Sequence, residues 1–274
     1  MIQQMRRSRV LEQLRAGGVA SCTKINSCDA RVAEIAAMSG LDCLFLCMEH
    51  VPSTLKDIEN QIRAAKMFDV DTLVRVPRGS YSDLIHPLEM DATAIMVPHV
   101  MSAADARKIV WQTRFHPIGR RPLDGGGADG GYCSIPGLEY MRQANAERML
   151  ILQIEDPEPL DDLEEIAALE GIDILFFGPG DFSQGIGAPC DFSHPKVVET
   201  LHRIPEVARR HGKFAGTVAS LGNRQELIDM GYRFLSIGAD VLMLSEGFAE
   251  IAAAFVHKPA GPAASIYASR KQDR

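Results

Sequence analysis

Short apolar runs alternate along the chain with longer stretches in which apolar residues recur every three or four positions. The short runs predict β-strands, and the longer periodic stretches predict amphipathic helices. Eight strands are expected, over residues 19–24, 43–47, 72–76, 94–98, 149–154, 174–177, 214–218 and 234–238. Helices are expected before, between and after them, over residues 6–15, about 30–39, about 54–65, 83–90, 102–111, 162–169, 195–210, 224–230 and 239–255.

The strands are apolar on both faces, which is typical of parallel strands covered by helices. This alternation predicts a closed (β/α)8 TIM barrel, with residues 1–274 as a single domain that carries an N-terminal and a C-terminal helix. An open dinucleotide-binding sheet would need Gly-x-Gly-x-x-Gly after the first strand, where Ile25-Asn26-Ser27-Cys28 stands instead. The regular pattern breaks over residues 114–148, a long loop rich in Gly and Pro with one helix expected near 138–143. Loops of this length are usually functional or mobile.

Composition narrows the choice of partners. Hydrophobic residues make up 46% of the chain and charged residues 24%, which excludes a disordered or fibrous protein. The formal net charge of −7 disfavours nucleic acid as a partner, although a locally positive pocket still allows a small anion. No apolar stretch approaches the ~18 residues needed to span a membrane. With no secretory signal, we expect a cytoplasmic protein whose six cysteines stay reduced.

Polar residues gather where the expected strands end, which is where TIM barrels place their chemistry. They are Glu49 and His50 after the second strand, Arg75 on the third, Gln153, Glu155 and Asp156 on the fifth, and Gly178-Pro179-Gly180-Asp181 after the sixth. Each taken singly has an equally good structural explanation, such as an ion pair at the barrel rim. Together they favour a ligand site, because charges that end apolar strands are costly to bury without a partner.

The chemistry that suits this set is metal-assisted enolate formation from a 2-oxo acid such as pyruvate. Glu155 and Asp181 are expected to hold a divalent cation, and Arg75 to share with it the charge of the enolate oxygen. The backbone N–H groups of Gly178-Pro179-Gly180 offer a seat for the substrate carboxylate. His50 is expected to move the proton of the aldehyde-derived hydroxyl. We expect no lysine at a comparable strand end, which argues against a Schiff-base aldolase.

Several motifs in this order resemble the HpcH/HpaI aldolase and citrate lyase family, and most closely its class II pyruvate-dependent aldolases. The resemblance runs from about residue 18 to 250 and rests on Glu49-His50, Val74-Arg75-Val76-Pro77, Pro117-Ile118-Gly119-Arg120-Arg121, Gln153-Ile154-Glu155 and Phe177-Gly178-Pro179-Gly180-Asp181-Phe182-Ser183. It implies a barrel of the phosphoenolpyruvate/pyruvate type and a bound Mg, Mn or Co ion. It also implies a homo-oligomer, a trimer or hexamer, in which subunits exchange the last helix.

The same resemblance implies a role for each matching residue. Glu155 and Asp181 would be metal ligands, Arg75 would stabilise the enolate, and His50 would be the acid–base. The implied substrate contacts are Gln153, Gly178, Pro179, Gly180 and Arg121. Glu89 would reach from a neighbouring subunit to orient the histidine.

The chain departs from the family pattern at four places. Cys47 stands where the family has an aspartate that supports the waters on the metal, which changes the surroundings of the ion. Glu89 replaces an aspartate, and Asp91 and Pro122 each replace a glycine. Residues 123–134 also differ in character, so substrate specificity cannot be copied from the family.

The leading hypothesis is therefore a lyase that cleaves a 4-hydroxy-2-oxo acid, such as a 2-keto-3-deoxy sugar acid, to pyruvate and an aldehyde. One alternative keeps the enolate but uses oxaloacetate or an acyl-CoA, as a citrate-forming or citrate-cleaving enzyme would. Its basic patch for coenzyme A would have to come from Arg114, Arg120 and Arg121. The other alternative is a non-catalytic binding barrel, which the complete set of expected catalytic residues disfavours.

Overall fold

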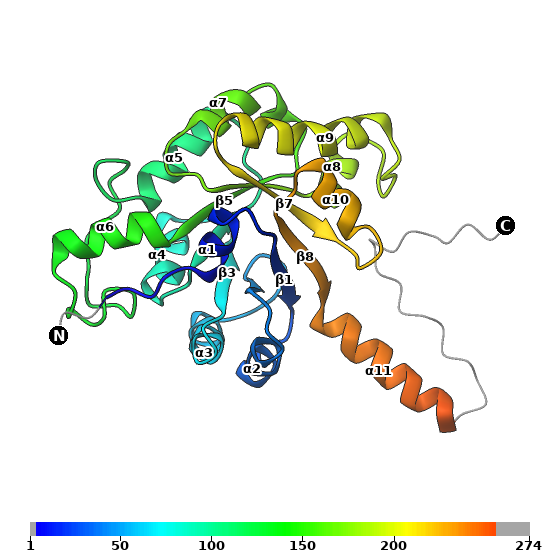
Figure 1. Ribbon diagram of the computed structural model, residues 1–274, viewed down its shortest axis with the longest axis horizontal. Coiled ribbons are helices and arrows are strands. Elements are labelled where there is room, and N and C mark those ends of the chain that lie inside the picture. The colour runs from blue at the N-terminus through cyan, green and yellow to red at the C-terminus, as the bar shows by residue number, and fades with distance from the viewer. Residues whose placement is uncertain (1–3, 256–274) are drawn as a thin grey trace.

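The computed structural model describes residues 4–255, and its eight parallel strands close into a barrel in sequence order (Figure 1). This confirms the predicted (β/α)8 fold, because β8 pairs with β1 and leaves the sheet no free edge. The strands are β1 (Ala20–Ile25), β2 (Cys43–Cys47), β3 (Asp71–Arg75), β4 (Ala94–Val97), β5 (Met149–Ile154), β6 (Ile174–Phe177), β7 (Phe214–Ala219) and β8 (Phe234–Ala239).

Most of the helices surround the barrel, whereas the first covers one of its ends and the last projects from it. They are α1 (Arg9–Arg15), α2 (Ala30–Met38), α3 (Leu55–Lys66), α4 (Tyr81–Glu89), α5 (Ala103–Thr113), α6 (Gly137–Glu147), α7 (Leu163–Ala168), α8 (Pro179–Gly185), α9 (Pro195–Arg210), α10 (Arg224–Met230) and α11 (Asp240–Phe255), with a 3-10 turn at Glu158–Leu160. Asp29, Thr54 and Ser102 cap α2, α3 and α5 by accepting hydrogen bonds from backbone N–H groups. The short helix α8 was not predicted.

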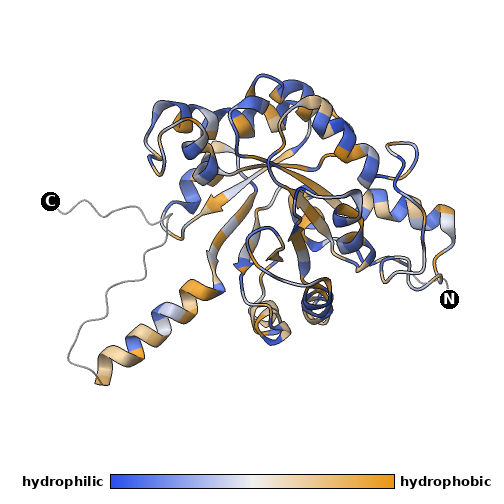
Figure 2. Ribbon diagram, turned by 180° about the vertical axis from the view of Figure 1, so that it is seen from behind, coloured by the Kyte–Doolittle hydropathy of each residue, from blue (hydrophilic) through white to orange (hydrophobic). Residues whose placement is uncertain are grey.

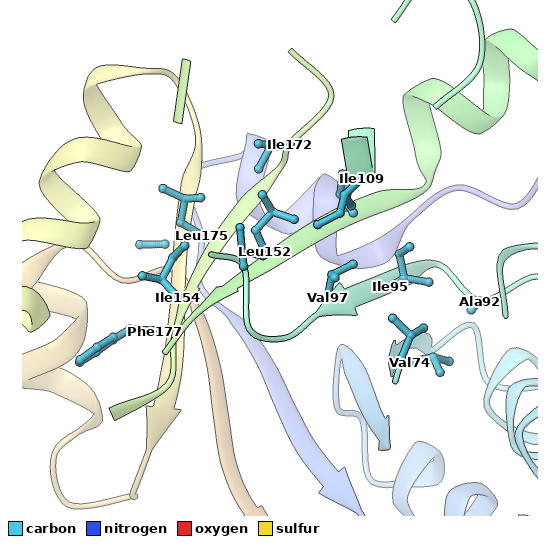
Figure 3. Close-up of a cluster of buried hydrophobic side chains, with 14 of the residues drawn as sticks. Val74, Ala92, Ile95, Val97, Ile109, Leu152, Ile154, Ile172, Leu175 and Phe177 are labelled. Carbon is cyan, nitrogen blue, oxygen red and sulfur yellow. The ribbon is translucent and has the colours of Figure 1, made fainter. Parts of the chain in front are cut away.

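The hydrophobic core has two layers. The outer layer lies between the strands and the surrounding helices, and Figure 3 shows part of it, with Ile109 among side chains from neighbouring strands. The inner layer fills the barrel, and Val10, Leu11 and Leu14 of α1 belong to it. Each such side chain contributes about 1.5–3 kcal/mol when fully buried. Because α1 packs into this inner layer, it covers the end of the barrel where the strands begin.

The last helix projects away from the barrel after β8 (Figure 1). Only Asp240 of α11 is buried, and apolar residues stay exposed along the helix, as the orange segments of Figure 2 show. The exposed ones are Val241, Met243, Leu244, Phe248, Ile251 and Phe255. Within residues 4–255, no helix is both long and apolar enough to cross a membrane.

Candidate active site

A cavity of about 830 Å³ opens where the barrel strands end. It brings together several of the residues singled out from the sequence, namely His50, Arg75, Gln153, Gly178 and Asp181. The far wall is formed by the ends of β7 and β8 and by the first turn of α11. Residues from distant parts of the chain therefore share one hollow at the predicted end of the barrel.

Arg75 is the fixed cation of this cavity. Its side chain is buried at the end of β3, and its Nε lies 2.9 Å from Oε2 of Glu49. The other guanidinium nitrogens donate to Sγ of Cys47 at 3.3 Å and to Oε1 of Gln153 at 3.5 Å. With partners on β2, directly after β2 and on β5, the guanidinium is held in place before any ligand binds.

Glu155 is a buried carboxylate in need of a positive partner. Its exposed fraction is 1%, and its Oε1 accepts a hydrogen bond from the backbone N–H of His99 at 3.0 Å. Burial, aided by the negative charge of Asp181, raises the pKa of Glu155 to about 7, despite the opposing effects of His99 and Arg75. A bound cation would offset this cost of burial.

His99 is a site residue that the sequence analysis missed. It follows β4, and its Nδ1 lies 2.8 Å from Oδ2 of Asp156, while its Nε2 lies 3.5 Å from Oε1 of Glu49. One ligand atom each from Glu49, His99 and Glu155 fall within 4.8 Å of one another. A carboxylate that orients a histidine beside further carboxylates is a common arrangement around metals. The position directly after a strand could have revealed His99, as it did His50.

The structure fits a divalent cation at this cluster. Oε2 of Glu49 is buried without a well-aligned hydrogen bond, so this carboxylate keeps acceptor capacity, and its Oε1 lies toward His99. Asp181 lies outside the close group of three and lines the cavity, whereas Glu49, His99 and Glu155 are not among the residues that line it. The oxygen-rich donor set suits hard ions such as Mg or Mn, and the imidazole also suits Co.

Gly178 keeps the floor of the site open. A Cβ atom placed there would come within 2.8 Å of both Cβ and Oε2 of Glu155, so a larger residue cannot fit without moving the carboxylate. Pro179 and Gly180, the other two expected carboxylate contacts, are half-buried in the first turn of α8. They do not belong to the residues that line the cavity.

His50 stands at the rim of the cavity with 55% of its side chain exposed. Its Nε2 lies 3.5 Å from Oε2 of Glu49. Burial and the charge of Arg75 lower the pKa of His50, which favours the neutral imidazole that a base requires.

Two expected site residues lie away from the cavity. Glu89 ends α4, and its carbonyl accepts a hydrogen bond from the backbone N–H of Ala128. The buried guanidinium of Arg121 donates to Asp129 at 2.9 Å and lies over the Phe115 ring at 4.7 Å. Arg121 therefore supports the long loop within this chain and makes no approach to the cavity.

Lys24 corrects the expectation that no lysine stands at a comparable strand end. It lies near the end of β1 and lines the cavity with Arg75. The sequence pattern places Lys24 at the end of the first strand, but Lys24 was not among the candidate site residues. Cys47 is buried beside Arg75, and although burial would raise the pKa of its thiol, the charge of Arg75 lowers it overall.

Comparisons with known proteins agree on one family. The model of the HpcH/HpaI aldolase/citrate lyase family matches residues 25–246. The chain is 34% identical over 254 residues to a 2-keto-3-deoxy-L-rhamnonate aldolase of Escherichia coli K12, covering 92% of this chain and 94% of the relative. The HpcH/HpaI aldolase from Desulfitobacterium hafniense DCB-2 superposes with a TM-score of 0.84 at 26% identity, covering 91% and 97% of the two chains. The crystal structure of citrate synthase SbnG superposes with a TM-score of 0.81 at 28% identity, covering 89% and 95%.

Proposed function

Because this chain belongs to the HpcH/HpaI aldolase/citrate lyase family and is a lyase, we propose that it cleaves 4-hydroxy-2-oxo acids reversibly to pyruvate and an aldehyde in the cytoplasm. The observation that carries the proposal is the buried Arg75, which lines the cavity with Gln153 and contacts Glu49 of the acidic cluster. A rigid cation next to a metal-binding set is what enolate formation from pyruvate needs.

The proposed ligands of the divalent ion are Glu155 and Asp181, and His99 and Glu49 offer ligand atoms close to Glu155. A bound Mg, Mn or Co ion would supply positive charge that polarises the carbonyl group of the substrate. Side chains of the protein itself bind the substrate, stabilise the developing charge and transfer the proton. Arg75 and Gln153 hold the keto oxygen, and the guanidinium stabilises the negative charge that develops there.

His50 is the proposed acid–base. In the cleavage direction it removes the proton of the C4 hydroxyl, directly or through one water, as the bond between C3 and C4 breaks. Its exposed position at the rim supports this role, since the aldehyde end of a substrate would extend toward the cavity opening. We propose that Glu89 of a neighbouring subunit orients His50 in the assembly.

A citrate-type condensation remains the second candidate, and the similarity to citrate synthase SbnG favours it. The same residues would then form an enolate that attacks a keto acid in place of an aldehyde. An acyl-CoA partner has less support, because the guanidinium groups of Arg114 and Arg121 are bonded to Asp173 and Asp129 within the fold.

Exchange of the methyl protons of pyruvate with deuterated water tests the enolate chemistry. The wild-type enzyme should catalyse exchange with Mg or Mn, and a chelator should stop it. Arg75→Ala should reduce exchange by roughly 100-fold or more, and Arg75→Lys should recover little because one ammonium cannot replace three directed contacts. Proton NMR follows the methyl signal.

Thermal unfolding of the variants is the control. A folded wild-type protein that exchanges with no divalent ion would contradict the proposal and favour a binding barrel. Loss of activity in Arg75→Ala that merely parallels loss of folded protein would identify Arg75 as a structural ion-pair partner.

A further inference from the structure

Lys24 brings a second cationic side chain into the cavity that holds Arg75. It pairs in register with Phe45 of β2 and Ala239 of β8. Ala20 and Cys22, at alternate positions of the same strand, belong to the packing inside the barrel, so the strand period turns Lys24 inward as well. Its Nζ lies 5.9 Å from the centroid of the Phe45 ring.

The ammonium group of Lys24 has no hydrogen bond or ion pair with any residue in the described part of the chain. The nearby acids are engaged elsewhere. Glu49 pairs with Arg75, and the carboxylate of Asp240 accepts hydrogen bonds from the backbone N–H groups of Asn26 and Ser27. A half-buried cation next to another cation is unfavourable until an anion binds between or beside them.

Burial lowers the pKa of Lys24, and the charge of Arg75 acts in the same direction, whereas Cys47, Glu49 and Asp240 oppose it. The effect of Arg75 on Lys24 agrees with their common position in the cavity. The cavity lining therefore carries two positive side chains beside the acidic groups described above, and Arg75 is paired with Glu49 whereas Lys24 is unpaired in the described part of the chain.

The cavity is larger than pyruvate requires. Its volume of about 830 Å³ lies in the range of sites that take much larger ligands. In the closed ring of strands, β1 stands across the barrel from β5, which carries Gln153. A substrate whose pyruvate end meets Arg75 and Gln153 would therefore extend its other half toward the side of Lys24.

Resting on the proposed function, we infer that Lys24 is a specificity-determining residue that binds an anionic group on the aldehyde half of the substrate. The preferred substrates are then 4-hydroxy-2-oxo acids with a second negative group, a carboxylate or a phosphate. A lysine ammonium is a point charge that accepts either group.

Addition of pyruvate to matched aldehydes tests this inference. One pair is butanal and succinic semialdehyde, and the other is glyceraldehyde and glyceraldehyde 3-phosphate. The wild-type enzyme should show a higher kcat/KM for the charged member of at least one pair. A preference for succinic semialdehyde would identify a carboxylate as the anion, and a preference for glyceraldehyde 3-phosphate would identify a phosphate. Lys24→Gln should lower that preference roughly 10- to 100-fold, mainly through KM, while Lys24→Arg should keep most of it.

Because each preference is a ratio within one protein, it is independent of how much of a variant folds. The inference is overturned if the wild type prefers the neutral member of both pairs, or if Lys24→Gln lowers both members of a pair equally. It is also overturned if borohydride fixes pyruvate covalently on Lys24, since the amine would then be a nucleophile. Absence of pyruvate exchange in the wild type would instead overturn the proposed function itself.

Discussion

Burial of Glu155 makes the stability of the metal-free protein depend on pH. Because its pKa is about 7 in the folded chain, against an ordinary value of 4.5, the folded protein holds this proton more tightly than the unfolded chain does. The free energy of unfolding of the metal-free protein should therefore fall as pH rises from about 4.5 to about 7.

Glu155→Gln removes this titration, so its unfolding free energy should change less across that pH range. Urea unfolding of both proteins in chelator, at several pH values, measures the difference. Parallel pH profiles for the wild type and Glu155→Gln would show that Glu155 titrates normally. The variant should also lose most of its affinity for Mn, since a neutral amide replaces a charged ligand.

Position at a strand end was enough to find Arg75, Gln153, Glu155 and Asp181 as candidates. His99 and Lys24 also stand at strand ends, but the sequence did not show which residues would lie near their side chains. The contact of His99 with Asp156 and the isolation of Lys24 depend on neighbours from other strands. Side-chain surroundings of this kind are set by barrel closure and are invisible along one strand.

Asp91, in the turn between α4 and β4, joins an unusual backbone conformation to a buried ion pair. Its φ is 75°, the left-handed region that favours glycine. Its side chain compensates, because Oδ1 accepts a hydrogen bond from Nη2 of Arg148 at 2.5 Å and Oδ2 contacts the ammonium of Lys66. The contacts of its carboxylate with Arg148 and Lys66 therefore offset the cost of the left-handed conformation at Asp91.

Asp91→Ala should lower the free energy of unfolding by about 3–5 kcal/mol, because it leaves Arg148 buried without its partner. Asp91→Gly should cost about 1 kcal/mol less, since glycine relieves the left-handed conformation. Chemical denaturation of the two variants gives both numbers. Equal or reversed losses would mean that backbone strain contributes nothing here.

At the level of elements, periodicity located every strand within one or two residues, because a barrel strand is a short apolar run with a clear beginning and end. Helix α8 was missed because Pro179-Gly180-Asp181-Phe182 reads as a loop, although proline suits the first turn of a helix. The long loop was predicted as irregular, and its packing around Arg121 could not be foreseen from composition.

The whole molecule exposes more apolar surface on α11 than a lone subunit would be expected to show. We propose that a second copy of the chain covers it, in a homo-oligomer such as a trimer or hexamer. Val241 and Leu242 of the same helix line the cavity, so the covered helix would also support the active site.

Phe248→Asp should weaken this association roughly 10- to 100-fold, because an exposed phenylalanine would lose burial worth about 1.5–3 kcal/mol. Light scattering during gel filtration, over a range of concentrations, measures the mass. Glu246→Gln, on an exposed position of the same helix, is the matched control and should keep the wild-type mass. A wild-type protein that stays monomeric at every concentration would contradict the proposal.

Because α1 closes the end of the barrel where the strands begin, reactants and products enter and leave at the opposite end. This predicts an ordered kinetic mechanism, because the oxo-acid fragment binds innermost, against Arg75 and Gln153. Pyruvate then binds before the aldehyde in synthesis and leaves after it in cleavage. The three aliphatic side chains of α1 that close one end of the barrel would thus determine the order of binding and release at the active site, which lies at the other end.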